Sequence, residues 1–179
     1  AKHPAHVDRP AHLGQAAEPI AYGKLLNAGQ TCLAPDSALV PDAEVQNFAD
    51  RLQGHMRRMY GTDPDNADYT SIISDRHYAR LEGLLADAAA KGARLMQAAK
   101  PGDPAWKSKR KFPPTLVLGA TPEMTIMQEE IFGPLLPVVG YKEAGEPVAW
   151  INDHDRPLAR DWFGKDGAAR DAGWARPGS

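Results

Sequence analysis

The sequence predicts an α/β fold, with a largely parallel sheet layered between helices. Helix patterns and strand patterns alternate along the chain, which is typical of consecutive β-α-β units. The 179 residues suffice for one ordinary domain, and a compact domain of that size buries roughly 68–70% of the surface that its unfolded chain exposes. Apolar residues make up 42% and charged residues 25% of the chain, a balance that excludes wholesale disorder. The only candidate boundary is the polar segment 101–111.

Four helices are predicted from apolar residues at helical spacing. The first covers 16–26, and Gly29 is placed to end it. The second covers 42–60, and spacings of 3, 4, 4 and 3 residues mark its apolar face at Val45, Phe48, Leu52, Met56 and Met59. The other two are expected at 74–91, where the first residue is a serine suited to the N-cap, and at 148–151.

Five strands are predicted from short apolar runs, at 38–40, 94–96, 115–118, 135–141 and 158–163. Pro137 lies inside the fourth of these strands, although a proline removes one backbone donor from a sheet. The chain holds 16 glycines and 16 prolines, so many turns are expected. The segments 61–68 and 101–111 are predicted to be irregular.

The charge balance gives no reason to expect nucleic acid or a membrane as a partner. There are 21 Lys and Arg against 23 Asp and Glu, for a net charge of −2. We therefore interpret the basic run K-S-K-R-K at 107–111 as a solvated face. No stretch approaches the roughly 18 apolar residues that span a bilayer, and the first four residues lack an apolar signal region. We expect a soluble, cytoplasmic protein.

Cys32 is the only cysteine, which excludes an internal disulfide and a cysteine-based zinc site. His3, His6 and His12 recur near the start of the chain, but Pro4 disfavours a helix that would align a His-x-x-His pair. We expect no metal site. The chain also contains neither a G-x-G-x-x-G segment nor a P-loop.

Cys32 has two interpretations on its residues alone. A lone cysteine in a cytoplasmic protein is most often a small buried hydrophobe. Here Gly29 precedes it by three residues, and a glycine lets the backbone turn sharply and approach a ligand closely. A cysteine acts as a nucleophile through its thiolate, so the environment of Cys32 decides between the two interpretations.

The segment Q-E-E-I-F-G-P at 128–134 also allows two interpretations. In the first, the acidic pair is exposed at the start of a strand and Phe132 lies in the core. In the second, a carboxylate accepts hydrogen bonds from sugar hydroxyls while the aromatic side chain packs against a flat ring.

Taken together, these two segments resemble the aldehyde dehydrogenase superfamily. The run G-K-L-L-N-A-G-Q-T-C at 23–32 resembles the segment that carries the active cysteine of that family, and E-E-I-F-G-P at 129–134 matches a second family motif. Within the family, three segments resemble the coniferyl aldehyde dehydrogenase branch: A-P-D at 34–36, D-Y-T-S-I-I at 68–73 and D-R-H-Y-A-R-L at 75–81. The resemblance runs from about residue 2 to residue 164.

The resemblance implies a role for three residues. Cys32 would be the nucleophile that attacks the aldehyde carbonyl, and its backbone N–H would form part of the oxyanion hole. Glu130 would hold the nicotinamide ribose of NAD or NADP, with Phe132 beside the same end of the cofactor. The intact enzyme would oxidise an aldehyde, aromatic in the coniferyl branch, to its carboxylate, and it would be a homo-oligomer.

The resemblance also implies that parts of the family's enzyme lie outside this sequence. Lys2-His3-Pro4-Ala5 best matches the K-S-P-A that follows the family's general-base glutamate, which would fall about three residues before Ala1. The coenzyme-binding domain and the oxyanion-hole asparagine would also precede Ala1. Residues 165–179 diverge from the family. We therefore expect 1–164 to be a partial catalytic domain that is inactive alone.

Two other functions stay open on the residues alone. The first is a thiol hydrolase or acyltransferase that uses Cys32 without a cofactor and needs a base near the thiol. None of the six histidines is placed for that role, since His55 and His77 fall in predicted helices, where a surface or boundary position is expected. The second is a non-catalytic globular chain that associates with longer homologous chains through open sheet edges.

Overall fold

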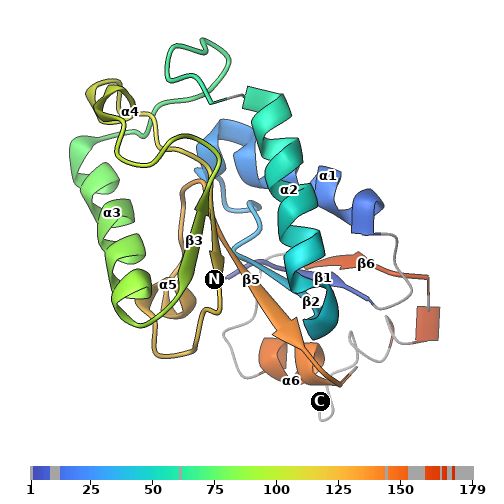
Figure 1. Ribbon diagram of the computed structural model, residues 1–179. Coiled ribbons are helices and arrows are strands. Elements are labelled where there is room, and N and C mark those ends of the chain that lie inside the picture. Colours follow the sequence, from blue (N-terminus) through green and yellow to red (C-terminus); the bar gives the residue numbers. More distant parts are fainter. Residues whose placement is uncertain are drawn as a thin grey trace.

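The protein forms one six-stranded sheet with helices on both faces (Figure 1). This description rests on a computed structural model that describes residues 2–8, 13–60, 62–143, 145–152, 160–165, 167, 168 and 171. The strands are β1 (Pro4–Val7), β2 (Ser37–Pro41), β3 (Arg94–Gln97), β4 (Thr115–Leu118), β5 (Leu135–Tyr141) and β6 (Asp161–Phe163). The helices are α1 (Leu13–Leu25), α2 (Val45–Tyr60), α3 (Asp75–Ala90), α4 (Pro104–Ser108), α5 (Thr125–Gln128) and α6 (Glu146–Asn152). Two 3-10 turns, η1 (Leu26–Gly29) and η2 (Asp42–Glu44), complete the elements.

The sheet is largely parallel, as the alternation of helices and strands predicts. Its strand order is β3-β4-β5-β2-β1-β6, and only the β3–β4 pair is antiparallel. Pro137 does not interrupt the centre of the sheet, because the β2–β5 register begins one residue later, at Ala38 opposite Val138. The α/β fold class and the predicted strands at 38–40, 94–96, 115–118 and 135–141 are confirmed.

The two faces of the sheet bury different strand residues because side chains alternate along a strand. Leu116 and Leu118 of β4 pack in one core with α1 and α2. Val117, between them, packs in the other core with α3 and α5. Figure 1 shows the same division, with α3 on one side of the sheet and α1 and α2 on the other. Helices on both faces cover the sheet, as parallel sheets require.

The local signals that predicted α2 and α3 also fix where these helices lie. Ser74 caps α3, and its hydroxyl oxygen accepts a hydrogen bond of 3.1 Å from the backbone N–H of His77. The apolar face of α2 is buried through Phe48, Leu52 and Met56. The predicted helix at 148–151 is confirmed as α6, and the predicted strand at 158–163 as β6, although 158 and 159 lie outside the described residues.

Three features of the fold were not predicted. β1 is a strand that pairs with both β2 and β6, although Pro-Ala-His-Val carries no alternating apolar pattern. The segment 101–111, predicted to be irregular, contains α4, which Asp103 caps by accepting a hydrogen bond of 2.9 Å from the N–H of Ala105. The helix α5 is a single turn directly before the acidic pair.

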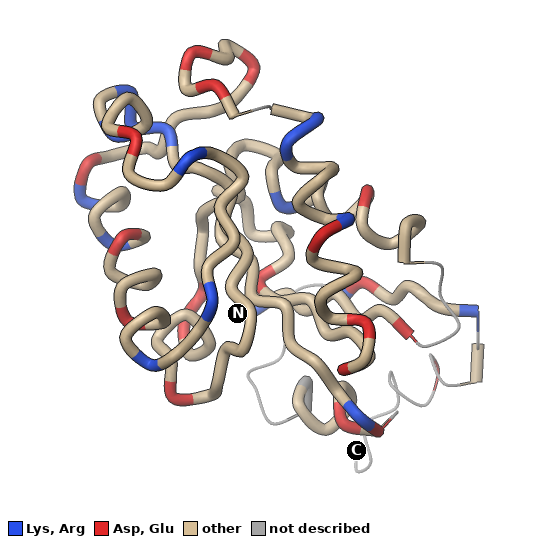
Figure 2. The backbone as a smooth tube through the Cα atoms, in the orientation of Figure 1, with Lys and Arg blue, Asp and Glu red and all other residues tan. Residues whose placement is uncertain are grey.

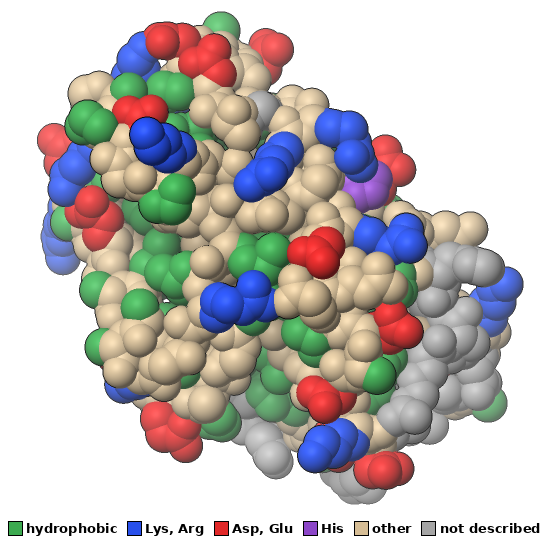
Figure 3. Space-filling model, in the orientation of Figure 1, with side chains coloured by type: hydrophobic (Ala, Val, Ile, Leu, Met, Phe, Trp, Pro, Cys, Tyr) green, Lys and Arg blue, Asp and Glu red, His purple; other side chains and the backbone are tan. Residues whose placement is uncertain are grey.

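Charges of both signs are spread over the surface that the structure describes (Figures 2 and 3). The basic run is solvent-exposed at 107–110 and is partly paired with acids, as the interpretation of a solvated face predicts. The ammonium of Lys107 lies 2.9 Å from the Glu82 carboxylate, and Lys109 pairs with Asp65. Within the described residues, no helix combines the length and apolar character needed to cross a membrane.

Candidate active site

The loop that carries Cys32 leaves α1 through an unusual backbone path. Asn27, Ala28 and Gly29 all have positive φ, at 52°, 52° and 75°. A residue other than glycine loses roughly 1–2 kcal/mol in this left-handed region, so the surrounding structure has to hold the first two. The chain then turns through Cys32, which is exposed. The interpretation of Cys32 as a buried hydrophobe is therefore wrong.

Gln30 fixes this loop to the segment that precedes α3. Its side-chain amide donates to the carbonyl of Ser71 at 3.1 Å and accepts from the N–H of Ile73 at 2.9 Å. The same amide nitrogen also lies 3.2 Å from the Asn27 carbonyl, and the Asn27 side chain donates back to the Gln30 carbonyl at 3.2 Å. These four hydrogen bonds tie the cysteine loop to the segment before α3.

A contact between two glycine backbones brings the cysteine loop against the E-E-I-F-G-P segment. A Cβ placed on Gly29 would lie 2.2 Å from the carbonyl oxygen of Gly133. A Cβ on Gly133 would in turn lie 2.5 Å from a methyl carbon of Leu81. Position 29 cannot carry a side chain unless the Gly133 backbone moves, so this contact joins the two segments that the family resemblance had paired.

We call residues 129–132 the acidic corner. Glu129 is exposed, Glu130 is half-buried, Ile131 is fully buried and Phe132 is half-buried. The interpretation that put Phe132 in the core is therefore wrong, since Ile131 takes that place. Phe132 has a φ of 53°, a left-handed backbone that a bulky residue adopts only when its neighbours impose it.

One face of α3 imposes that conformation by binding the backbone of the acidic corner. Arg80 donates to the carbonyl of Ile131 at 2.7 Å and to that of Glu130, and it also pairs with the Glu129 carboxylate at 2.9 Å. His77 lies three residues earlier on α3, and its Nε2 is 2.6 Å from the carbonyl of Phe132. Because a carbonyl can only accept, that ring nitrogen carries the proton.

His77 and Arg80 are two residues of the candidate site that were not predicted from the sequence. His77 was expected at a surface or boundary position, and it is indeed half-buried, but its partner in the acidic corner was not foreseen. The spacing of three residues puts both side chains on one face of the helix. The sequence shows that spacing, but it does not show which segment of the protein packs against that face of the helix.

Asp36 holds the acidic corner from the opposite direction. Its side chain is 3% exposed, and one carboxylate oxygen accepts from the N–H of Ile131 at 3.1 Å. The other oxygen accepts from the N–H of His3 at 3.4 Å, and the N–H of Asp36 donates to the His3 carbonyl at 2.7 Å. Asp36 thus ties the start of β1 and the start of β2 to the residue between Glu130 and Phe132.

Arg80→Ala is expected to lower the free energy of unfolding by about 1–3 kcal/mol, because three acceptors of the acidic corner lose a charged donor. Denaturant titration of the purified chain measures this loss. Arg76→Ala is the matched control, since Arg76 is exposed on the same helix, and it should cost no more than about 0.5 kcal/mol. Equal losses for the two variants would contradict the binding of the corner by Arg80.

Among the described residues, no group of three or more His, Cys, Asp or Glu side chains is arranged to hold a metal ion. His3 is buried directly before β1, His6 is buried within β1, and His12 lies outside the described residues. The ring of His6 packs edge-on against Trp162, with centroids 4.3 Å apart, and burial lowers the pKa of His6 to about 4. His6 is therefore neutral at pH 7 and acts as a packing residue of the core.

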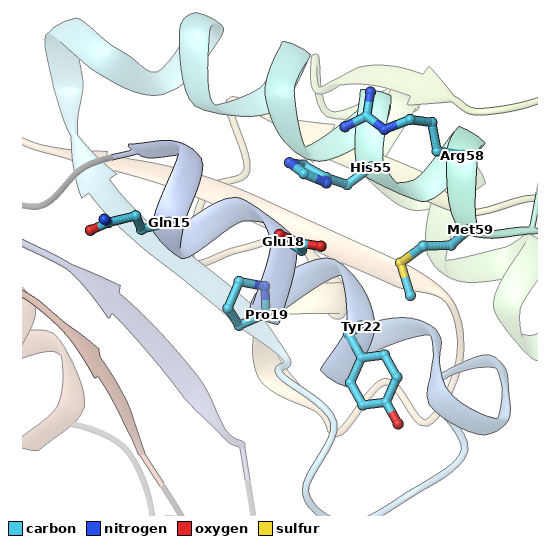
Figure 4. A pocket seen from close by; sticks show the side chains of 7 residues that line it. All are labelled: Gln15, Glu18, Pro19, Tyr22, His55, Arg58 and Met59. Atoms are coloured by element: carbon cyan, nitrogen blue, oxygen red, sulfur yellow. The ribbon is translucent and has the colours of Figure 1, made fainter.

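A cleft of about 620 Å³ lies on the outer side of α1 and α2, away from the cysteine loop. Figure 4 shows the residues that line it, among them Glu18, Pro19 and Tyr22 on α1 and His55, Arg58 and Met59 on the neighbouring α2. None of Cys32, Glu130 or Phe132 lines it. The cleft is therefore separate from the candidate active site.

The described structure is an α/β domain that presents an exposed thiol on a glycine loop, beside an acidic and aromatic corner. Comparisons with known proteins identify the family to which this domain belongs. Residues 1–172 match the description "Aldehyde dehydrogenase family". This chain belongs to the aldehyde dehydrogenase family.

Curated relatives include coniferyl aldehyde dehydrogenases. The chain is 48% identical over 171 residues to "Probable coniferyl aldehyde dehydrogenase" of Caulobacter vibrioides, a match that covers 95% of this chain and 35% of the relative. It is 39% identical over 174 residues to "Coniferyl aldehyde dehydrogenase" of Pseudomonas sp. strain HR199, covering 95% and 36%. The chain thus spans about a third of the length of these relatives.

Solved structures give the same family. The substrate-bound Staphylococcus aureus AldH superposes with a TM-score of 0.87 at 34% identity, covering 97% of this chain and 36% of that one. The NADP-dependent glyceraldehyde-3-phosphate dehydrogenase of Bacillus halodurans, complexed with NADP, gives 0.85 at 30% identity, with the same coverage. The fold therefore corresponds to about a third of these enzymes.

Proposed function

We propose that this chain supplies the nucleophile and the nicotinamide-ribose corner of an NAD(P)-dependent aldehyde dehydrogenase. The observation that supports the proposal is the backbone contact between Gly29 and Gly133, which brings the Cys32 loop against the segment that contains the acidic corner. The assignment of roles to Cys32, Glu130 and Phe132 extends the resemblance of their segments to the family. It is supported by the exposure of the thiol and the half-buried state of the other two.

In the proposed reaction, the Cys32 thiolate attacks the aldehyde carbonyl carbon, a C–S bond forms and the carbonyl oxygen becomes an oxyanion. Loss of hydride from that carbon re-forms the C=O bond and leaves a thioester on Cys32. Water then adds to the thioester, and the C–S bond breaks to give the carboxylate and the free thiol. The family resemblance implies that the glutamate that activates this water would precede Ala1.

The backbone of Cys32 is suited to stabilise the oxyanion. Within the described part of the chain, its N–H donates no hydrogen bond, whereas the N–H groups of Gln30 and Ala34 are paired with loop carbonyls. An N–H left available beside a nucleophile is the donor that an oxyanion hole requires. The N–H groups of Thr31 and Leu33 in this turn donate no hydrogen bond to the described residues either, so the family resemblance is what selects the N–H of Cys32 for that role.

The residues of the acidic corner fit the ribose and ring of a nicotinamide cofactor. The Glu130 carboxylate would accept hydrogen bonds from ribose hydroxyls, and the half-buried Phe132 ring would pack beside the same end of the cofactor. When bound, NAD or NADP supplies the acceptor for the hydride. The clamping of the corner by His77 and Arg80 keeps both side chains in place before the cofactor arrives.

The substrate class that the site supports is an apolar or aromatic aldehyde of the coniferyl type. Leu33, next to the nucleophile, is 62% exposed. Ile73 is 75% exposed, and Gln30 ties its backbone to the cysteine loop. Exposed apolar side chains around a reactive group are typical of a site for an apolar ligand. The coniferyl aldehyde dehydrogenases among the relatives support this class.

The proposal includes an assembly and a location. The rat relative, 37% identical over 160 residues, is named "Aldehyde dehydrogenase, dimeric NADP-preferring", and the chain covers 33% of it. We propose that the intact enzyme is likewise a homo-oligomer that acts on a small molecule in the cytoplasm. Neither nucleic acid nor a membrane takes part in the proposed reaction.

The proposal is tested with the isolated chain and with a chimera. In the chimera, this chain replaces the matching segment of the Caulobacter vibrioides relative, which supplies the remaining two thirds. With coniferyl aldehyde and NAD or NADP, the isolated chain should form no NADH or NADPH, and the chimera should form it with at least about a tenth of the parent's kcat. The melting temperature of the chimera verifies its folding. A folded chimera that oxidises no aldehyde, beside an active parent, would contradict the proposal.

A further inference from the structure

Lys24 is the most unusual charged residue near the site, because its side chain is fully buried at the end of α1. It is 0% exposed, and its ammonium has no hydrogen-bond partner among the described residues. Burial lowers the pKa of Lys24 to about 8, while the nearby Asp36 and Glu130 carboxylates act in the opposite direction. At pH 7 most molecules therefore carry a buried positive charge, and burial of that charge opposes folding.

The charged residues that act on Lys24 lie in the acidic corner or in segments that contact it. Lys24 interacts electrostatically with Asp36, Lys2 and Glu130. Lys2 is also buried and donates to the Ile126 carbonyl at 2.7 Å, so its ammonium already has a fixed partner. Asp36 uses both carboxylate oxygens for backbone N–H groups, one of them that of Ile131.

We propose that Lys24 is a positioning residue whose buried charge, acting with Asp36, fixes the acidic corner in the conformation that presents Glu130. Asp36 must stay ionised and in place to hold the N–H of Ile131, and a buried cation nearby favours both. The Glu130 carboxylate also acts on the pKa of Lys24, so its negative charge is likewise attracted to this cation. The link from this arrangement to cofactor binding rests on the proposed function.

The test uses Lys24→Met, Asp36→Asn and the double variant in the isolated chain, with Lys91→Met as the control. Lys91 is an exposed lysine that pairs with Asp87 at 2.7 Å. Thermal melting reports stability, and amide hydrogen exchange at Ile131, relative to the β4 amides, reports whether the corner is held. Asparagine at position 36 carries no charge and has one side-chain acceptor oxygen, so it can keep only one of the two bonds to backbone N–H groups.

Lys24→Met should leave the melting temperature unchanged or higher, because methionine fills the space without a buried charge. It should nevertheless speed exchange at Ile131 by about tenfold while the β4 amides stay the same. Asp36→Asn should lower the melting temperature by about 5 °C or more, and addition of Lys24→Met should recover part of that loss, since it removes the uncompensated cation but not the lost acceptor. Lys91→Met should change neither exchange nor this coupling.

Unchanged exchange at Ile131 in Lys24→Met would overturn the proposal. Strictly additive effects of the two substitutions on melting would also overturn it, because the two charges would then act independently. In the chimera, Lys24→Met should raise KM for NAD(P) by about fivefold with kcat within about twofold. If exchange changes as expected but this KM does not, the positioning of the corner stands, and the assignment of the corner to the cofactor fails.

Discussion

Cys32→Ser is expected to lower aldehyde oxidation by the chimera about 10³-fold or more, with little effect on folding. A serine hydroxyl is not ionised near neutral pH, so it attacks a carbonyl far more slowly than a thiolate. The side chain of Cys32 is exposed in a turn and makes no hydrogen bond within the described residues, so its replacement should shift the melting temperature by no more than about 2 °C. Production of NADH or NADPH with coniferyl aldehyde measures the activity.

Chemical modification of Cys32 is a second test of its role, because it is the single cysteine of this chain. Alkylation of the folded chain with iodoacetamide should add one carbamidomethyl group, readable as one mass shift, because only one thiol exists and it is exposed. The chimera should lose activity in proportion to the fraction of Cys32 modified, which mass mapping of the peptide that contains Cys32 measures. A Cys32→Ser chimera that keeps more than about a tenth of the activity would remove Cys32 as the nucleophile.

The prediction of the fold from sequence succeeded where the signal was local. The N-cap at Ser74 and the apolar face of α2 depend on residues within a few positions of each other, and both are observed. β1 was missed because its four residues form a strand by pairing with β2 and β6, and both of these strands lie far along the chain. A strand buried on both sides in a parallel sheet does not need the alternating pattern that sequence reasoning seeks.

The candidate site also combines features that local sequence predicts with features that depend on long-range packing. Its two segments were found through their resemblance to a family, but nothing in their sequences says that Gly29 and Gly133 touch. The sequence also could not show that Lys24 is buried, since lysine is almost never fully buried. A lysine in the last turn of a helix is also common, because it can interact with the last carbonyls of the helix. Long-range packing supplies both facts, and both concern how the acidic corner is held.

Gly29→Ala is expected to destabilise the chain more than Arg80→Ala or Asp36→Asn, with a loss of about 3–5 kcal/mol or no folded protein. The new Cβ would lie 2.2 Å from the Gly133 carbonyl oxygen and 2.5 Å from its carbon, distances that the backbone can relieve only by moving. The displaced partner cannot retreat freely, because Gly133 is itself packed against Leu81 of α3. Urea titration of the isolated chain measures the loss.

Gly119→Ala is the matched control for this substitution. Gly119 has a φ of 72°, close to the 75° of Gly29, but a Cβ there would meet nothing within 4 Å. Its loss should be about 1–2 kcal/mol, the cost of a left-handed backbone alone. The difference between the two variants therefore measures the contact between the cysteine loop and the corner. If both variants lose the same free energy of unfolding, that contact contributes nothing to stability. The position of the cysteine loop beside the acidic corner would then depend on other contacts.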